Sequence, residues 1–574
     1  MPETVAQRVA LALQRHGVEL IFAQSLPSAV VLACEALGIR QIAYRQENMG
    51  GAMADGFARV SGKFGVVCAQ NGPAATLLVP PLSEALKASI PLLALVQEVE
   101  RPQLDKNAFQ EIDHLGLFMA CTKWTRRVIT ADRIDDYLDQ AVVAATSGRP
   151  GPAALLLPAD LLREPSTAPS ITRSVTMGNW PLDSFRPGDA SLSEAAAILA
   201  TAENPVIIAG GGAVSSEASI ALEDFIELAH VPTFTTNMGK GAINEHGPLA
   251  CGVLGALNGP GSLGSYSKKI LDSADVVFLI GTRTNQNGTD SWRSMPSTAK
   301  LIHLDIDPQE IGRNFEALRL TGDVATTLRS LGEAIRSQDL TKRKTNRPRI
   351  EQSVAEAWSA FKEDRMVYAG SKAIPIRPER IMLELQSLLT PETIVVADAS
   401  YSSMWIVGQL RGLRTGQRFI TPRGLAGLGW GLPLAMGAKL ASPESPVIVL
   451  VGDGGFAHSW AEMETLIRDK IPLTILLLNN GVLGYQKDAE TVKFGSYTSA
   501  CHFTPVDHAA IAAACGCEAT AVRKAGDIGP AMRKAFDGEG PTLIEFFSDP
   551  DAHPPISLYA GTLDPVPPAV AGAA

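Results

Sequence analysis

The chain lacks an excess of positive charge, a paired set of cysteines and a long apolar segment, and each absence excludes a class of protein. The net charge of −10 and the lack of a basic stripe argue against a nucleic-acid partner. Seven cysteines are scattered over 574 residues without the spacing of a disulfide framework, so we expect a reducing, cytoplasmic location. The N-terminus has helical periodicity and matches neither a signal peptide nor a membrane span, so we expect no membrane partner.

What the chain does contain is an α/β pattern. Short apolar runs alternate with helical patterns, which predicts parallel sheets covered by helices on both faces. We therefore expect an α/β fold with three doubly wound parallel-sheet domains. The predicted strands include residues 19–22, 64–68, 92–96, 153–157, 206–209, 276–280, 301–304 and 394–397.

Two stretches interrupt the alternation and predict the domain boundaries. Residues 163–190 are rich in Pro, Ser and Thr, and residues 338–352 carry a basic polar run, so we interpret both as linkers. The domains between them have an ordinary size. The expected units are a first domain, a central domain, a third domain and a Pro-rich tail, over residues 1–165, 190–337, 370–550 and 551–574.

The third domain contains a motif typical of metal–diphosphate binding. Predicted strands over residues 447–451 and 473–478 are each followed by polar or glycine residues, which are Gly452, Asp453, Gly454 and Gly455 after the first and Asn479 and Asn480 after the second. Carboxylate and amide oxygens at adjacent strand ends, together with diphosphate oxygens, form an octahedral Mg²⁺ site. The glycines let backbone N–H groups approach the diphosphate. The alternative is an ordinary turn after a buried strand, which the spacing to Asn480 disfavours.

Residues 44–63 of the first domain combine a carboxylate with a helix of small residues. Glu47 follows a predicted strand, and the small residues after it permit close packing against another subunit or a cofactor. Taken alone, Glu47 is equally consistent with a solvated glutamate that caps a helix N-terminus. Together with the Gly-Asp-Gly motif, the segment resembles the aminopyrimidine-binding part of thiamine diphosphate enzymes. In that family, the matching glutamate hydrogen-bonds the pyrimidine ring nitrogen, and its proton promotes activation of the thiazolium carbon.

Further segments resemble acetolactate synthase, within the same superfamily. The resemblance covers nearly the whole chain, in the order pyrimidine domain, central domain, diphosphate domain. It implies decarboxylation of a 2-oxo acid such as pyruvate and bond formation with a second carbonyl group, so the expected partner is a small-molecule substrate. The segments that carry the resemblance are residues 107–113, 120–124, 147–152, 303–308, 427–433 and 437–439.

The resemblance also implies which residues form the site. Leu428 matches the apolar residue that props the cofactor into a bent shape, although a single Leu is otherwise most often a core residue. Gln110 matches a substrate contact, for which a surface amide near a helix start is the alternative. The implied catalytic residues are Glu47 and Gln110, and the implied metal ligands are Asp453, Asn480 and the Val482 carbonyl. The implied cofactor contacts are Glu47, Tyr401, Ser402, Ala426, Leu428, Gly452, Asp453, Gly454, Gly455, Asn480 and Val482.

In this family, the pyrimidine and diphosphate domains that share one cofactor come from different subunits. The resemblance therefore implies a homodimer or homotetramer with shared active sites. In such an assembly, Glu47 of one chain faces Asp453 of the partner subunit.

Four segments depart from the acetolactate synthase pattern. The synthases have a Gly-Gly loop where residues 24–28 read Gln-Ser-Leu-Pro-Ser, and a His where Gln46 precedes the catalytic glutamate. Residues 284–287 replace a Phe-Asp-Asp-Arg run of the FAD loop, and residues 481–488 replace a Trp-containing acceptor segment. Residues 210–212 are three glycines without the Gly-x-Gly-x-x-Gly spacing, so a tight turn is as consistent as a dinucleotide loop. FAD and the acceptor substrate are therefore left open.

Two other functions are consistent with these residues. Tyr485 and Gln486 replace the usual acceptor segment and favour a lyase or decarboxylase for a bulkier 2-oxo acid, acyloin or acyl-CoA. A thiamine diphosphate-binding homologue without catalysis is the other, and the retention of Glu47 argues against it. The His-His pair of simple 2-oxo acid decarboxylases is absent. His114 and His458 could serve as acid–base groups, but we interpret each as a structural histidine.

Overall fold

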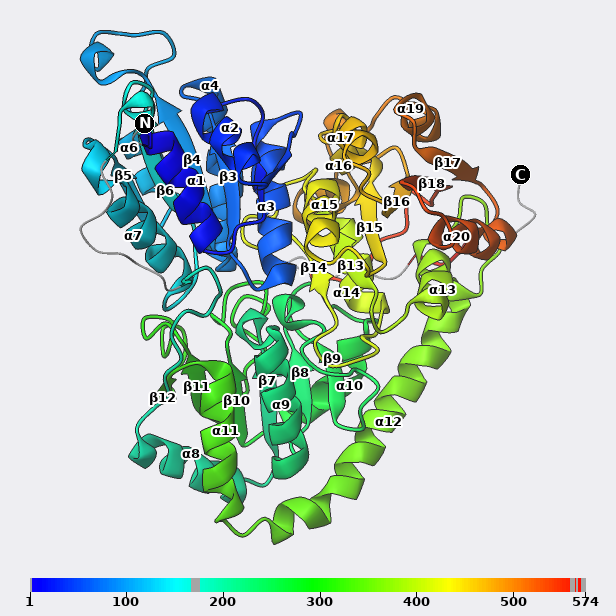
Figure 1. The fold of residues 1–574 in the computed structure, drawn as a ribbon. Helices are drawn as coiled ribbons and strands as arrows, with labels where there is room; N and C mark the ends of the chain where they lie inside the picture. The colour runs from blue at the N-terminus through cyan, green and yellow to red at the C-terminus, as the bar shows by residue number, and fades with distance from the viewer. Residues whose placement is uncertain (1–2, 167–175, 558–562, 564–565, 569–574) are drawn as a thin grey trace.

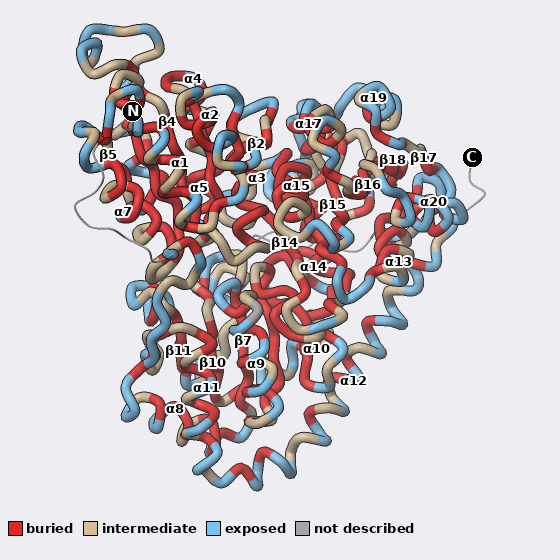
Figure 2. The backbone as a smooth tube through the Cα atoms, viewed as in Figure 1, coloured by how far each residue is buried: buried red, intermediate tan, exposed pale blue. Residues whose placement is uncertain are grey.

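The computed structural model describes residues 3–166, 176–557, 563 and 566–568, and its elements form three α/β domains. Figure 1 shows the first domain in blue and cyan beside the third in yellow to red, with the central domain in green below both. Each domain contains a parallel sheet of six strands, and these strands are largely buried (Figure 2). The prediction of three doubly wound parallel sheets is confirmed.

The first sheet has its strands at the positions that the apolar runs predict. Its strands, in sheet order, are β2 (Arg40–Ile42), β1 (Leu20–Phe22), β3 (Gly65–Ala69), β4 (Leu92–Glu98), β6 (Ala153–Pro158) and β5 (Trp124–Arg127). Its helices are α1 (Val5–Arg15), α2 (Ser28–Ala36), α3 (Glu47–Ser61), α4 (Pro73–Leu77), α5 (Val79–Ala88), α6 (His114–Met119) and α7 (Ile134–Thr146).

The central sheet is built in the same way from short buried strands. Its strands, in sheet order, are β12 (Leu318–Thr321), β11 (Lys300–Asp305), β10 (Val276–Ile280), β7 (Pro205–Ala209), β8 (Thr233–Thr235) and β9 (Ala250–Val253). Its helices are α8 (Asp189–Thr201), α9 (Ser216–Ala229), α10 (Leu263–Asp272) and α11 (Val324–Arg336).

The third sheet repeats the strand order of the first. Its strands, in sheet order, are β14 (Phe419–Ile420), β13 (Ile394–Ala397), β15 (Val447–Gly452), β16 (Thr474–Asn479), β18 (Thr542–Phe547) and β17 (Glu518–Val522). Counted from its own first strand, this order is 2-1-3-4-6-5, as in the first domain. Its helices are α13 (Pro378–Leu388), α14 (Tyr401–Gln409), α15 (Gly431–Ala441), α16 (Asp453–Phe456), α17 (Glu462–Arg468), α18 (Gly484–Phe494), α19 (His508–Ala514) and α20 (Ile528–Phe536).

The first and third domains pack through equivalent helices, α3 and α15. Each helix follows the strand that is second in chain order within its domain, β2 or β14. Small residues let these helices approach closely, because a Cβ at Gly437 would lie 1.9 Å from the Met53 carbonyl oxygen and one at Gly56 would lie 2.1 Å from that of Leu434. Buried apolar residues of both domains form one continuous cluster around the contact. The helix of small residues predicted after Glu47 therefore packs against the third domain of the same chain.

The stretch 338–352 links the domains as a helix. Most of it lies in α12 (Thr341–Ala369), which runs from the central domain to the third domain (Figure 1). The basic residues are compatible with a helix because Arg347 pairs with Glu351 one turn away and Arg343 donates to the Ala202 carbonyl. Part of the other predicted linker, residues 167–175, lies outside the described residues. The domain boundaries predicted above remain a proposal.

The described start of the C-terminal tail lies against the central domain. Gly259 N–H donates to the Pro555 carbonyl at 2.7 Å, and Ser557 N–H donates to the Ala256 carbonyl at 2.7 Å. Within the described ranges, no helix has both the length and the apolar character needed to cross a membrane.

Candidate active site

The polar residues predicted for the third domain meet in one pocket at the carboxyl ends of β15 and β16. Nearly all of the predicted third-domain contacts line it, namely Tyr401, Ser402, Leu428, Gly452, Asp453, Gly454, Gly455, Asn480 and Val482. Ala426 lies on the adjoining loop and does not line the pocket. Because the strands are parallel neighbours, with Gly452 opposite Leu478, the turns that follow them lie side by side.

Asp453 is the only carboxylate among the predicted metal ligands, and it is buried at the start of α16. One of its oxygens accepts a hydrogen bond from Gly481 N–H at 2.8 Å. Burial raises the pKa of the Asp453 carboxyl group to about 6, since desolvation disfavours its charge. A nearby cation would relieve that cost.

The other predicted ligands follow β16. The side-chain oxygen of Asn480 accepts from Val482 N–H at 3.2 Å, and Val482 lines the same pocket. Among the described residues, no group of three or more His, Cys, Asp or Glu side chains is arranged to hold a metal ion.

Leu428 projects from a loop whose shape depends on a residue that the sequence analysis did not single out. The buried carboxylate of Asp398 accepts hydrogen bonds from the N–H groups of Gly429, Trp430 and Gly431 at 2.9 to 3.1 Å. Leu428 is 37 % exposed, so it is not a core residue. The available signal was the position of Asp398, directly after a strand in the sheet that carries the Gly-Asp-Gly turn.

Ser402 and Tyr401 line the pocket from the first turn of α14. The Tyr401 hydroxyl donates to the Asp488 carboxylate, and its ring packs edge-on against Tyr485 with 6.2 Å between ring centres. Burial raises the pKa of the Asp488 carboxyl group. Tyr401 thus connects α14 to α18 at the side of the pocket, and its hydroxyl is already hydrogen-bonded to Asp488.

The two predicted catalytic residues lie in the first domain. Glu47 is the half-buried first residue of α3. Gln110 lies in a loop with a positive φ of 63°, where Gln70 donates to its side-chain oxygen at 2.9 Å. Asn71 donates to the Gln110 carbonyl at 3.2 Å. These contacts hold Gln110 in place. Neither catalytic residue lines the third-domain pocket of the same chain.

Both ring nitrogens of His114 are hydrogen-bonded within this domain. Its Nε2 accepts from Gly72 N–H at 3.0 Å, so Nδ1 carries the proton and donates to the Glu98 carboxylate at 3.2 Å. Arg127 pairs with Glu98 and holds the pKa of that carboxyl group below its usual value, against the opposing effect of burial. The interpretation of His114 as structural agrees with these contacts.

Comparison with known proteins identifies the family to which these three domains belong. Three family models for thiamine pyrophosphate enzymes match in order, the N-terminal TPP binding domain over residues 3–117, the central domain over 192–331 and the C-terminal TPP binding domain over 398–546. The chain belongs to the thiamine pyrophosphate enzyme family. The resemblance inferred from its motifs is thereby confirmed, and the pocket lies within the part matched to the C-terminal TPP binding domain.

Two curated relatives of this thiamine pyrophosphate enzyme match it over nearly its whole length. The probable acetolactate synthase large subunit of Methanococcus aeolicus is 31 % identical over 565 residues, 95 % of this chain and 92 % of that protein. The acetolactate synthase isozyme 2 large subunit of Escherichia coli is 29 % identical over 550 residues, 95 % of each chain.

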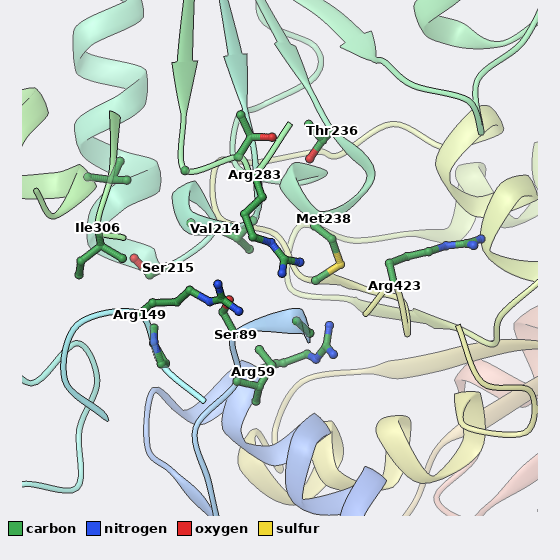
Figure 3. A pocket seen from close by; sticks show the side chains of 18 of the residues that line it. Arg59, Ser89, Arg149, Val214, Ser215, Thr236, Met238, Arg283, Ile306 and Arg423 are labelled. Atoms are coloured by element: carbon green, nitrogen blue, oxygen red, sulfur yellow. The ribbon is translucent and has the colours of Figure 1, made fainter. Parts of the chain in front are cut away.

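A second cavity of this thiamine pyrophosphate enzyme lies where the three domains meet. It has a volume of about 210 Å³ and is rich in arginine. Figure 3 shows Arg59, Arg149, Arg283 and Arg423 around it. Its central-domain wall includes the three-glycine turn, where Gly212 N–H donates to the Gly281 carbonyl at 3.0 Å. A Cβ at Gly210 would lie 2.4 Å from that carbonyl oxygen, so the tight turn requires a glycine at this position.

Proposed function

We propose that the protein decarboxylates a 2-oxo acid and joins the remaining acyl unit to a second carbonyl compound, with thiamine diphosphate and Mg²⁺ as cofactors. The observation that carries the proposal is the single pocket in which Asp453, Asn480 and a glycine-rich turn meet at adjacent strand ends. The relatives described above are acetolactate synthase large subunits, which supports this reaction.

The residues of the pocket fit both cofactors. Asp453, Asn480 and the Val482 carbonyl offer hard oxygens to Mg²⁺, which also binds phosphate oxygens. A bound cation would stabilise the ionised form of the Asp453 carboxylate, which burial disfavours. The N–H groups of the glycine turn can approach the diphosphate. Thiamine diphosphate supplies the electron-accepting ring that amino-acid side chains lack.

Glu47 would hold and share a proton at the aminopyrimidine ring, and the exposed Leu428 would support the bent cofactor. Because Glu47 does not line the third-domain pocket of its own chain, we propose a homodimer or larger homo-oligomer in which two chains complete each site. Exposed apolar side chains lie near both halves of the site, as expected for a surface that a second copy covers. They are Phe109, Ile112, Leu425, Leu428 and Phe503.

We also propose that the arginine-rich cavity holds an anionic cofactor, with FAD as the candidate. Arg283, which lines the cavity, would face its phosphate groups. Arg149 and Arg423 line the cavity too, but they already bond to Glu310 and to Ser403. The visible absorption spectrum of the purified protein tests this directly. Flavin absorption that remains after gel filtration supports FAD, whereas a colourless protein that does not take up added FAD contradicts it.

The reaction is tested with a panel of 2-oxo acids in the presence of thiamine diphosphate and Mg²⁺. CO₂ release, free aldehydes and ligated products are measured together. Ligated product from any 2-oxo acid supports the proposal. Release of free aldehyde as the only organic product would instead assign a decarboxylase, and cleavage of an acyloin or acyl-CoA would assign a lyase.

A further inference from the structure

Two buried glutamates occupy equivalent positions in the first and third domains. Glu84 lies on α5, between the third and fourth strands of its domain, and Glu462 lies on α17, between the third and fourth strands of the other. They are only 2 % and 1 % exposed. Each reaches across the boundary between the two domains and binds backbone of the opposite one.

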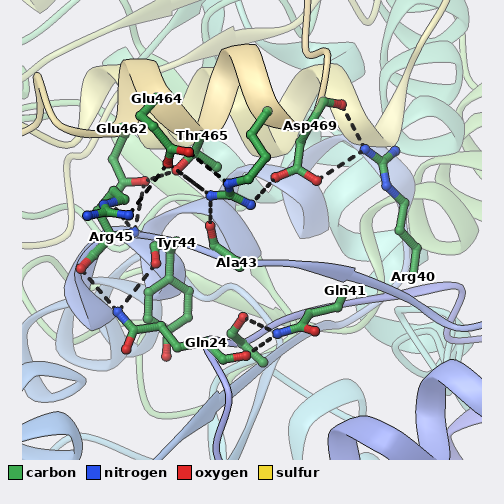
Figure 4. Close-up of polar contacts among 12 residues, drawn as sticks. Gln24, Arg40, Gln41, Ala43, Tyr44, Arg45, Glu462, Glu464, Thr465 and Asp469 are labelled. Atoms are coloured by element: carbon green, nitrogen blue, oxygen red, sulfur yellow. Dashed lines mark hydrogen bonds and ion pairs between the residues drawn. The ribbon is translucent and has the colours of Figure 1, made fainter. Parts of the chain in front are cut away.

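Glu462 binds the segment that leads into Glu47. Its Oε1 accepts from Arg45 N–H at 3.0 Å and from Gln46 N–H at 3.2 Å (Figure 4). Its Oε2 accepts from the Thr465 hydroxyl at 2.8 Å. Gln46 is the N-cap of α3 and Glu47 is its first residue, so the third domain sets the position of the backbone that carries Glu47.

Glu84 makes the corresponding contacts in the opposite direction. Its carboxylate accepts from Gly424 N–H at 2.6 Å, from Leu425 N–H and from Ala426 N–H at 3.3 Å. Arg59 lies 3.5 Å away and supplies a positive charge. The loop held in this way leads into Leu428, so the first domain sets the position of the loop that would face the aminopyrimidine ring.

Buried carboxylates that accept several hydrogen bonds are expensive to leave without partners. The donors around Glu462 are N–H and O–H groups, which match an ionised carboxylate and leave the backbone little freedom. Loss of these bonds would allow the backbone of Arg45 and Gln46, which leads into Glu47, to move. A shift of about 1 Å in a catalytic group lowers the rate by as much as roughly a hundredfold.

We propose that Glu462 and Glu84 are reciprocal positioning residues, with Glu462 fixing the backbone that carries Glu47 and Glu84 fixing the loop that carries Ala426 and Leu428. The proposal rests on the proposed function, which assigns catalysis to Glu47. Neither glutamate touches the cofactor in this scheme. In the proposed oligomer, the first and third domains of one chain belong to two different active sites. Both carboxylates lie between these two domains and therefore connect the two sites.

The matched control is Glu464, two residues along the same helix. Glu464 pairs with Arg468 at 3.0 Å and with Arg45 at 3.7 Å, and its side chain is 46 % exposed. It shares the domain boundary with Glu462 but contacts no backbone N–H of the segment before Glu47 (Figure 4). Glu464→Gln therefore changes charge at the same surface without releasing that segment.

The test compares Glu462→Ala, Glu462→Gln and Glu464→Gln as full-length protein loaded with thiamine diphosphate and Mg²⁺. Exchange of the thiazolium C–H with deuterium is measured without substrate, together with cofactor affinity and thermal unfolding. We expect Glu462→Ala to slow exchange by about tenfold to a hundredfold with cofactor affinity nearly unchanged. Glu462→Gln keeps one accepting oxygen and should lose less. Glu464→Gln should exchange like the unmodified protein.

Exchange at the unmodified rate in a folded Glu462→Ala or Glu462→Gln protein would overturn the proposal. An equal loss in Glu464→Gln would overturn it too, since the effect would then belong to the surface as a whole. The measurement needs no substrate, so it separates the two proposals. Normal exchange without ligated product would contradict the proposed reaction and leave the positioning roles standing, whereas no exchange in the unmodified protein would overturn both.

Discussion

The carboxylate of Asp453 accepts a hydrogen bond from Gly481 N–H, with 2.8 Å between oxygen and nitrogen. Asp453 follows β15, and Gly481 lies two residues after the end of β16. The bond therefore joins the turns of two neighbouring strands, and it brings Asp453 and Asn480 into one site through the protein alone. The metal site that we propose is built on this contact.

Replacement of Asp453 by alanine should abolish the Mg²⁺-dependent part of thiamine diphosphate affinity, because the only carboxylate among the proposed ligands is lost. Calorimetric titration with and without Mg²⁺ measures the effect. Asp551 is an exposed carboxylate that pairs with Lys487 at 3.0 Å, so Asp551→Ala is a control expected to bind normally. Equal affinity in Asp453→Ala and the unmodified protein would remove this metal site.

Glu47→Gln should retain cofactor binding and lower turnover by about a hundredfold or more, since the amide cannot share a proton with the aminopyrimidine ring. Steady-state kinetics and cofactor titration on the same preparation separate the two quantities. Unchanged turnover would show that Glu47 has no catalytic role in this chain and would favour its interpretation as a helix N-terminal residue.

Asp305, which lies outside the proposed metal site, should make the free energy of unfolding depend on pH. Burial raises the pKa of its carboxyl group to about 6, above the ordinary value of 3.8. The folded protein then holds this proton more tightly than the unfolded chain, so the stability gained at low pH is lost as the pH rises through about 6. The linkage amounts to roughly 3 kcal/mol.

Asp305→Asn should remove that loss, because the amide oxygen can still accept from Asp307 N–H, a bond of 2.9 Å in the native protein. The variant should therefore melt above the unmodified protein at pH 7.5, and the difference should shrink at pH 5. Thermal unfolding at several pH values checks this. A difference that is constant across the range would contradict the assignment.

Lys240 and Glu245 form a buried ion pair within the central domain, where that domain meets the third. Lys240 donates to Glu245 at 2.8 Å and to the Leu410 carbonyl at 2.7 Å, and both side chains are almost fully buried. Lys240→Met leaves the Glu245 charge without its cation and should cost about 3 to 5 kcal/mol. The double variant Lys240→Met, Glu245→Gln should recover much of this. A thermal unfolding curve for Lys240→Met that matches the unmodified protein would contradict the prediction.

The sequence predicted the sheets and the third-domain pocket because both depend on local patterns. Strands follow from short apolar runs, and the ends of parallel strands meet, so Asp453 and Asn480 could be placed together before the structure was known. The fold also explains why Leu428 is exposed, since Asp398 shapes its loop.

Other features depend on contacts between distant parts of the chain and had no local signal. Glu462 and Arg45 are separated by 417 positions, and Glu84 and Gly424 by 340, so neither pair is visible in a sequence pattern. The stretch 338–352 was predicted as a linker from its polarity, but its spacing of charges suits a helix. The hydrogen bond between Tyr401 and Asp488 was likewise hidden, because only the fold brings α14 and α18 together.

The most direct measurement supplies the purified protein with thiamine diphosphate, Mg²⁺ and pyruvate alone, and follows CO₂ and acetolactate together. The account predicts that both form in equal amounts and that Asp453→Ala abolishes both. Thiamine diphosphate bound to the protein with consumption of neither pyruvate nor any other 2-oxo acid of the panel, or CO₂ released with free aldehyde as the only organic product, would contradict it.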